Sequence, residues 1–420
     1  MNRISRHKNG LTVITAEMPH MASVSLGIWA GVGGRYEPAP LSGVSHFIEH
    51  LLFKGTRHRT AKQISQDVEG IGGYLNAFTT EETTCFYSKA RHNCFHELLD
   101  VLTDMFLNST FDPAEIDKER NVIKEELAMY LDQPQHHVQE LLNEALWPSQ
   151  PLGRSLTGTV ETIDRMTRKH LLEYRNVNYV SRGTVLAAAG NLDHEKIVKA
   201  VSRFARHFPE GDRPQFAPAT NRQTSPVVRL FTKSIEQTQL ALGIRTCSRH
   251  DERRFALRLL NTLLGENMSS RLFQVVREDH GLAYSICSSL CFFDDVGTTT
   301  ISAGLETEKL SKALKLITRE LQRLSQTLVS PGELRRARDY VIGQIDLSLE
   351  STENQMMWLA EQILGYGKVI SAAEIKQRLS EVRANEIRHV ARDFFRPERI
   401  NLALVSPLKN VAGLAPLLRI

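Results

Sequence analysis

Residues 46–50 of this chain read His-Phe-Ile-Glu-His, which combines two imidazoles and a carboxylate at a spacing suited to metal chemistry. Positions i, i+3 and i+4 of a helix lie on one face, so His46, Glu49 and His50 point the same way. Two imidazoles one turn apart can take neighbouring positions on Zn²⁺, and the carboxylate between them can act on a nearby water. The order of the residues is that of the HExxH metallopeptidase motif in reverse. The motif therefore predicts that His46 and His50 bind zinc and that Glu49 acts as a general base.

The same five residues also have a structural interpretation. Apolar residues flank the motif and give the predicted helix a buried side: Phe47, Ile48, Leu51, Leu52 and Phe53. A motif with three fixed positions occurs by chance, so a pair of core histidines on a helix is the alternative.

A catalytic zinc site needs a third protein ligand and keeps one position for water. The helix that begins at Asp112 contains Glu119 and Glu126, which are seven positions apart and so lie on one face. In one interpretation Glu126 binds the metal and Glu119 supports the site from behind. The alternative is a solvated acidic helix, which is what we expect for Glu125. Spacing by itself leaves the role of Glu126 open.

Several segments occur twice, in the same order and at a nearly constant offset, on the two sides of the polar, proline-rich stretch Pro209–Pro226. Asp112 and Ser330 each open a capping box followed by proline, which predicts the start of a long helix in each half. The paired segments are Ser25–Ile28 with Ala241–Ile244, Asp112–Glu115 with Ser330–Glu333, and Thr184–Ala189 with Ile400–Val405. Their offsets of 216 and 218 positions indicate one duplicated fold.

We predict an α+β fold of two homologous domains, each a largely antiparallel sheet with helices packed on one face. Residues 1–210 form the zinc-binding domain, residues 211–226 a linker, and residues 227–420 a second domain without a metal site. In that second domain the alignment places Ala337 opposite Glu119 and Gln344 opposite Glu126. One half of the duplication is therefore expected to be catalytic.

Length and composition exclude several other classes of protein. The 420 residues are 41% hydrophobic and 24% charged, which is typical of a globular chain too long for one core. A net charge of +4 is too small to imply nucleic acid or an anionic membrane as a partner. The five cysteines show no CxxC spacing, the N-terminus lacks the apolar run of a secretory signal, and Leu11–Thr15 reads as the first strand. No apolar stretch is long enough to span a membrane. We expect a cytoplasmic protein.

The segments HFIEHLLFKGT and ERNVIKEE resemble the pitrilysin family of zinc peptidases, especially the branch that contains the mitochondrial processing peptidase. The family pattern is HxxEH, then about 76 residues, then a glutamate that lies seven residues after another glutamate. Glu126 lies 76 positions after His50. The resemblance thus implies that His46, His50 and Glu126 hold one Zn²⁺ per chain and that Glu119 supports it.

The resemblance also implies residues that handle the substrate. Gly72–Thr80 and the alternating stretch after it predict a strand that follows a glycine turn. In the family this strand is an edge strand that pairs with substrate backbone; its residues here are Asn76, Ala77, Phe78 and Thr79. An ordinary sheet strand is the alternative.

In the second half, Arg277 and Tyr284 match an arginine and a tyrosine that contact the substrate main chain near the scissile bond in the family. The alternatives from the residues themselves are an ion pair of Arg277 with Glu278 or Asp279, and a half-buried strand tyrosine.

The resemblance implies a zinc endopeptidase that cleaves unfolded peptides inside a chamber built by two chains. We expect a homodimer, and a heterodimer is the alternative. In such a dimer Arg277 and Tyr284 serve the zinc site of the other subunit. Two rivals are a non-catalytic structural subunit, like the core proteins of the respiratory bc1 complex, and a zinc-dependent peptide-binding module without turnover. The complete set of His46, Glu49, His50 and Glu126 argues against the first rival.

Overall fold

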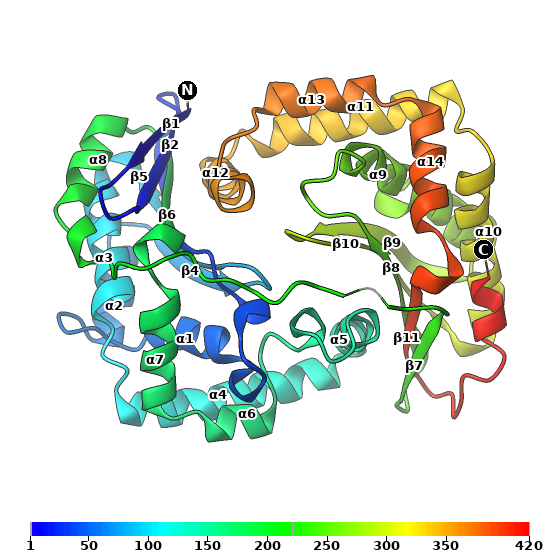
Figure 1. Ribbon diagram of the computed structural model, residues 1–420, viewed down its shortest axis with the longest axis horizontal. Coiled ribbons are helices and arrows are strands. Elements are labelled where there is room, and N and C mark those ends of the chain that lie inside the picture. Colours follow the sequence, from blue (N-terminus) through cyan, green and yellow to red (C-terminus); the bar gives the residue numbers. More distant parts are fainter. Residues whose placement is uncertain (1, 221, 420) are drawn as a thin grey trace. The chain divides into compact units, whose positions relative to one another are not determined.

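The recurring apolar runs form fully buried strands in the middle of two sheets (Figure 1). The computed structural model describes residues 2–220 and 222–419. The strands of the first sheet are β1 (Asn2–Arg6), β2 (Thr12–Glu17), β3 (Ser23–Ala30), β4 (Tyr74–Thr79), β5 (Thr84–Arg91) and β6 (Thr184–Gly190). Those of the second sheet are β7 (Val227–Thr232), β8 (Gln237–Thr246), β9 (Ala283–Phe292), β10 (Gly297–Glu306) and β11 (Ile400–Ser406).

The five strands of the second sheet repeat the topology of five strands of the first sheet, which has β1 as an additional edge strand. The first has the order β1-β2-β6-β3-β5-β4, and the second has the order β7-β11-β8-β10-β9. In each sheet one neighbouring pair is parallel, β2 with β6 and β7 with β11, and the other pairs are antiparallel. The predicted α+β class and the duplication are confirmed. Leu11–Thr15 is not the first strand, because β1 precedes it; β1 contains a single apolar residue, Ile4, and so gave no apolar pattern.

Helices surround each sheet, and the two long helices begin where the capping boxes predicted. Asp112 Oδ1 accepts hydrogen bonds from the N–H groups of Ala114 and Glu115, and Ser330 exchanges reciprocal bonds with Glu333. The helices are α1 (Val44–Leu52), α2 (Ala61–Glu69), α3 (Phe95–Asn108), α4 (Pro113–Asp132), α5 (Pro134–Leu146), α6 (Val160–Arg165), α7 (Arg168–Asn178), α8 (His194–Ser202), α9 (Arg254–Asn261), α10 (Leu310–Gln326), α11 (Pro331–Ser348), α12 (Thr352–Tyr366), α13 (Ala372–Glu381) and α14 (Ala384–Phe394).

Helices were predicted on one face of each sheet, but both faces are covered, because a helix from the other sequence half packs on the second face. In the first sheet, Val13 and Leu26 face a core shared with α1 and α3, while Ile14 and Trp29 face α12. In the second sheet, α5 packs against Ala241 and its neighbours on β8 and β11. A strand buried on both faces is apolar at most positions, which is why β6 and β11 show nearly continuous apolar runs, interrupted in β11 by the buried Asn401.

The contact-defined units reflect this exchange of helices. One unit comprises the chain up to Ala128, Arg154–Ala217 and Asp346–Val369; the other comprises Met129–Gly153, Pro218–Ile345 and the chain from Ile370 onwards. A division of the chain at the proline-rich stretch alone would not give these units, because α12 packs on the first sheet and α5 packs on the second. From Pro209 to Pro226 the described residues form neither helix nor strand.

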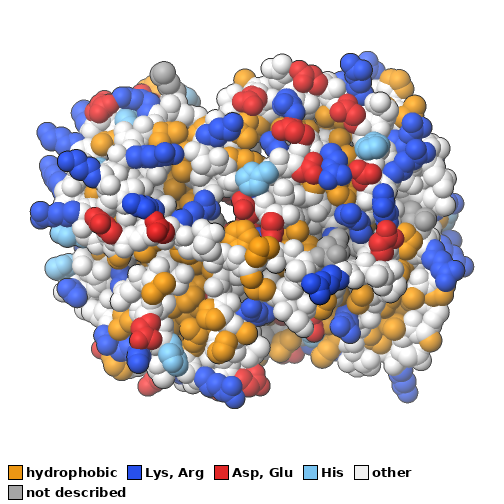
Figure 2. Space-filling model, in the orientation of Figure 1, with side chains coloured by type: hydrophobic (Ala, Val, Ile, Leu, Met, Phe, Trp, Pro, Cys, Tyr) orange, Lys and Arg blue, Asp and Glu red, His pale blue; other side chains and the backbone are white. Residues whose placement is uncertain are grey.

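Charged side chains of both signs are interspersed over the face shown in Figure 2. The five cysteines form no disulfide bond with one another. Within residues 2–220 and 222–419, no helix combines the length and the apolar character that crossing a bilayer requires.

Candidate metal centre

The helix α1 carries the His-x-x-Glu-His motif and is anchored by its apolar side. Phe47, Ile48, Leu51 and Leu52 are buried in the core of the first sheet. Just before the helix, Gly43 has a φ of 91°, and a Cβ there would lie 2.7 Å from the carbonyl oxygen of Thr157. This conformation and this contact both require glycine. The buried apolar face and the Gly43 turn fix the orientation of α1, so that His46, Glu49 and His50 lie on the side of the helix that meets α4 and β4.

The N-terminus of α1 is capped by a buried carboxylate that the sequence did not indicate. Glu37 is 3% exposed and accepts hydrogen bonds from the N–H groups of Gly43 at 2.7 Å and Ser45 at 2.8 Å. These two groups are among those that a helix start leaves without intrahelical partners. Burial raises the pKa of Glu37 to about 7, against the opposing effect of the Ser45 and Gly43 amides.

This pKa predicts a pH dependence of stability that a single substitution removes. The folded-state pKa of Glu37 lies above its ordinary value of 4.5, so the folded chain keeps a proton that the unfolded chain has released. The contribution to stability is full below pH 4.5 and is lost as pH rises towards 7, on the order of 3 kcal/mol in all. Glu37→Gln should flatten this part of the profile in urea unfolding at a series of pH values. Parallel profiles for the two proteins would contradict the prediction.

The structure brings His46, His50 and Glu126 together. Glu126 lies on α4, and its Oε2 is 3.7 Å from His46 Nε2 and 3.5 Å from His50 Nε2. The imidazole ring centroids are 4.6 Å apart. The three ligand atoms lie within 4.8 Å of one another, and in the described part of the chain no other group of histidine, cysteine or acidic residues is arranged to hold a metal. Glu125, the neighbouring carboxylate, is exposed.

These three residues fit a zinc ion. With zinc–ligand bonds of about 2.1 Å, two ligands of a tetrahedral site lie about 3.4 Å apart. The two distances from Glu126 to the imidazoles are close to that value. His46 Nδ1 is buried without a hydrogen-bond partner among the described residues. Burial and the neighbouring His50 lower the pKa of His46 to about 4, whereas the Glu119 and Glu126 carboxylates overcome burial and raise the pKa of His50 to about 9 in the absence of a metal ion. Both rings must be neutral to bind a metal, so metal binding displaces a proton from His50.

Glu119 orients one of the two imidazoles from behind. His50 Nδ1 is 3.0 Å from Glu119 Oε2, which directs the Nδ1 proton to Glu119 and leaves Nε2 facing Glu126. The other Glu119 oxygen is 2.8 Å from Lys54 Nζ. Burial opposes ionisation of Glu119, but His50 and Lys54 outweigh it and lower its pKa. Sequence reasoning missed Lys54, which lies two residues beyond the end of α1.

The Glu49 carboxylate lies beside the histidines and contacts β4. Thr79 Oγ1 donates a hydrogen bond of 2.6 Å to Glu49 Oε2. Burial raises the pKa of Glu49, and the Thr79 bond works in the opposite direction. A raised pKa makes the carboxylate a stronger base, which suits the role of a general base. Thr79 was placed in the strand predicted to pair with substrate backbone, and its hydrogen bond to Glu49 was not predicted.

The strand β4 lies at the edge of its sheet, with β5 as its neighbour. Gly72, with a φ of 71°, precedes it as the predicted glycine turn. Asn76 is exposed, Ala77 and Phe78 are half-buried, and Asn76 Oδ1 accepts a hydrogen bond from the Ala77 N–H. An edge strand presents backbone N–H and C=O groups that an extended peptide can pair with.

Arg277 and Tyr284 lie in the other contact-defined unit and are close to each other. The guanidinium carbon of Arg277 is 5.2 Å from the Tyr284 ring centroid and 4.7 Å from that of Phe273. Arg277 Nε is also 3.5 Å from Glu278 Oε1, so the ion pair considered as an alternative is present. Tyr284 is 80% exposed at the start of β9, which differs from a half-buried strand tyrosine. The exposed ring leaves its hydroxyl group accessible.

The counterpart of the metal helix in the second half carries an ion pair instead of metal ligands. Arg258 on α9 donates two hydrogen bonds to Glu266, at 2.5 and 2.6 Å. Thr262 also donates to Glu266. The position opposite Glu119 is Ala337, which is buried in the apolar core.

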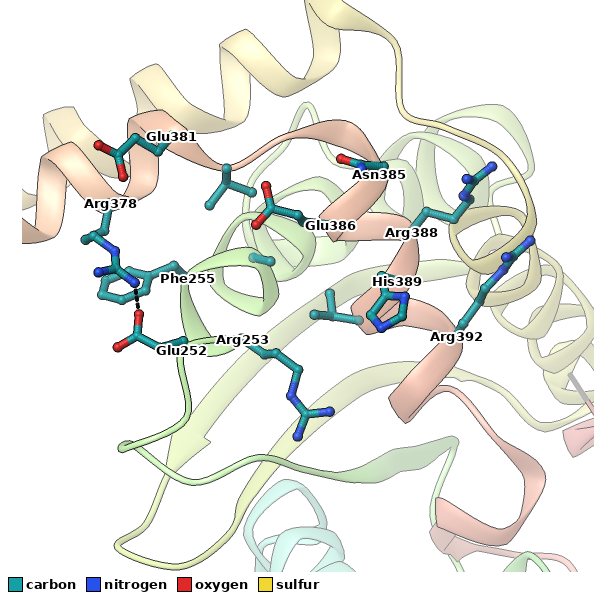
Figure 3. A pocket seen from close by; sticks show the side chains of 13 residues that line it. Glu252, Arg253, Phe255, Arg378, Glu381, Asn385, Glu386, Arg388, His389 and Arg392 are labelled. Carbon is teal, nitrogen blue, oxygen red and sulfur yellow. Dashed lines mark hydrogen bonds and ion pairs between the residues drawn. The ribbon is translucent and has the colours of Figure 1, made fainter.

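A cavity of about 500 Å³ in the second unit is lined by residues of α9, α13 and α14 and by Glu252 and Arg253, which directly precede α9 (Figure 3). Arg378 pairs with Glu252 across it, as the dashed line shows, and stacks over Phe255. Arg253 pairs with Asp251 and Asp393. Arg378 and Glu252 are thus an ion pair between two residues that line the cavity, whereas the partners of Arg253 lie outside its lining.

Family models match most of the chain. The model described as Insulinase (Peptidase family M16) matches residues 12–160, and the model described as Peptidase M16 inactive domain matches residues 165–341. A protein named as an uncharacterized zinc protease of Bacillus subtilis is 36% identical over 409 residues, covering 96% of this chain and 98% of its own length. One of Streptomyces coelicolor is 36% identical over 407 residues, covering 96% and 88%. The chain belongs to peptidase family M16, and the predicted pitrilysin-type relationship is confirmed.

Solved structures show the same fold. A protease from Helicobacter pylori superposes with a TM-score of 0.90 at 20% identity, over 97% of this chain and 99% of that one. A protein from Pseudomonas fluorescens described as a peptidase M16 inactive domain superposes with a TM-score of 0.89 at 18% identity, over 97% and 98%. At these identities the likeness concerns the fold alone.

Proposed function

We propose that this chain is a zinc-dependent endopeptidase that hydrolyses unfolded peptides, with one zinc held by His46, His50 and Glu126 and with Glu49 as general base. The observation that carries the proposal is the convergence of two imidazoles and a carboxylate beside a second, separately held carboxylate. The zinc-protease names of the relatives agree with it.

The roles of the residues follow from their contacts. A zinc ion at this site supplies Lewis acidity, which lowers the pKa of water and polarises a carbonyl group. Glu49 Oε2 accepts the Thr79 hydrogen bond, so Oε1 is the atom that takes the proton of the attacking water and returns it to the leaving amine. Glu119 keeps His50 in the tautomer that presents Nε2.

The proposed substrate is an extended peptide on the free edge of β4. Main-chain pairing along Asn76, Ala77, Phe78 and Thr79 gives affinity without reading side chains, which suits an enzyme for unfolded segments. Arg277 and Tyr284 are proposed to bind substrate carbonyls, for which an exposed phenol and a guanidinium provide donors.

We further propose that two chains form the closed chamber in which cleavage takes place. Each chain has a duplicated fold with a single metal cluster among its described residues, so the second half of one chain is free to serve the zinc site of another. A second copy of this chain is the expected partner, and a related chain is the alternative.

Zinc analysis and a cleavage assay test the function together. Protein purified without chelator should contain about one zinc per chain and should cleave a library of unstructured peptides. Chelator should abolish cleavage, and added zinc should restore it. His50→Ala should lose the metal, because two remaining ligands make a poor site. Bound zinc without any cleavage would favour a peptide-binding module, and protein without zinc would support a structural subunit.

A further inference from the structure

The Glu49 carboxylate is tied to β4 by the hydroxyl group of Thr79. The donor–acceptor distance of 2.6 Å is in the range of hydrogen bonds to an ionised carboxylate, which are shorter and stronger than neutral ones. The two residues are 30 positions apart and lie on different elements, α1 and β4. The bond therefore links a side chain of α1 to a side chain of β4.

The pleat of β4 explains why Thr79 reaches the metal helix. Alternate residues of a strand share a face, so Thr79 lies on the face of Ala77 and Leu75. Those two pack against the core that contains the apolar side of α1. Phe78 lies on the opposite face and meets the Trp29 ring edge-on at 5.3 Å. Thr79 is thus the polar position in a row that otherwise makes apolar contacts with α1.

We propose that Thr79 is a positioning residue that holds the Glu49 carboxylate in the orientation needed for proton transfer. This inference rests on the peptidase function proposed above. A glutamate side chain has considerable rotational freedom, and ordering it has an entropic cost that a short hydrogen bond offsets. With Oε2 held by Thr79, Oε1 remains oriented for water.

The arrangement also couples the base to the substrate. β4 is the strand whose free edge is proposed to pair with the peptide, and the Thr79 side chain extends from the same strand to Glu49. One strand therefore determines where the peptide lies and where the carboxylate lies. Small displacements between reacting groups reduce rates strongly, so this shared support should affect kcat more than KM.

Thr79→Val tests the proposal, because valine keeps the branched shape that suits a strand and removes only the donor. We expect kcat for an unstructured peptide to fall about 10- to 100-fold, with KM and zinc content close to wild type. Thr79→Ser, which restores a hydroxyl, should recover most of kcat. Thr299→Val is the matched control, since Thr299 lies on β10 and its buried hydroxyl has no hydrogen-bond partner in the described part of the chain. This control should keep wild-type kcat.

Wild-type kcat in Thr79→Val, or failure of Thr79→Ser to recover activity, would overturn the positioning role. A second measurement separates this inference from the proposed function. This measurement compares crystal structures of the zinc-loaded wild type and the zinc-loaded Thr79→Val variant. In the variant, the Glu49 carboxylate should be turned away from the orientation that it has in the wild type. A wild-type protein that cleaves no peptide would show that the proposed function is wrong. Independently of that result, an unchanged Glu49 orientation in Thr79→Val would overturn the positioning role.

Discussion

Glu49→Gln should leave the zinc content and the fold unchanged and should lower peptidase activity by roughly 10²-fold or more. Glutamine has the size of glutamate, and its carbonyl oxygen can still accept the Thr79 hydrogen bond that Glu49 Oε2 accepts now. What the substitution removes is the ability to take up a proton. Because Glu49 is not among the three residues that converge on the metal position, zinc should remain bound.

The measurement is kcat on an unstructured peptide, with zinc analysis of the same sample. Glu125→Gln is the matched control, since it makes the same chemical change at an exposed position next to a proposed ligand. It should keep wild-type activity. Near wild-type turnover in Glu49→Gln would place the general base elsewhere.

Two inactive variants should restore activity to each other when they are co-expressed. Arg277→Ala removes a proposed donor to substrate carbonyls and, like the loss of other such donors, should reduce kcat by about 10²-fold. Glu49→Gln removes the base. In a mixed dimer with Arg277 supplied by the partner, one of the two sites has an intact Glu49 facing an intact Arg277. Random assortment in a two-fold dimer should recover about a quarter of wild-type activity.

Subunit exchange is essential to this experiment, so the mixture must be co-expressed or refolded together. Simple mixing of the two folded proteins is the control. Co-expressed variants that stay inactive, although light scattering confirms a dimer, would show that Arg277 does not act on the partner's site. A fully active monomer would contradict the chamber.

Much of the fold was predictable because it depends on local patterns. The buried runs at Thr184–Ala189 and Ile400–Val405 and the caps at Asp112 and Ser330 each involve only a few successive residues, and the structure has the predicted elements at these positions. The duplication was predictable because these patterns recur in the same order at a nearly constant offset. β1 was missed because an edge strand with one apolar residue shows no such pattern.

The placement of α5 and α12 was decided by tertiary structure. Each packs on the sheet of the other sequence half, as the clusters around Trp29 and Ala241 show. Continuous apolar strands indicate that both faces are covered, but they do not identify the helix that covers the second face.

The sequence by itself predicted the chemistry proposed for the candidate site, because residue types and helical spacing place His46, Glu49 and His50 on one face of α1. The choice of Glu126 already needed the family resemblance. Only the tertiary structure revealed the cap of Glu37 on α1 and the hydrogen bond from Thr79 to Glu49. Glu37 precedes α1 in the chain, and Thr79 lies on a strand, 30 positions after Glu49. Such contacts depend on how loops and sheets pack against a helix, and no periodicity within one element encodes that packing.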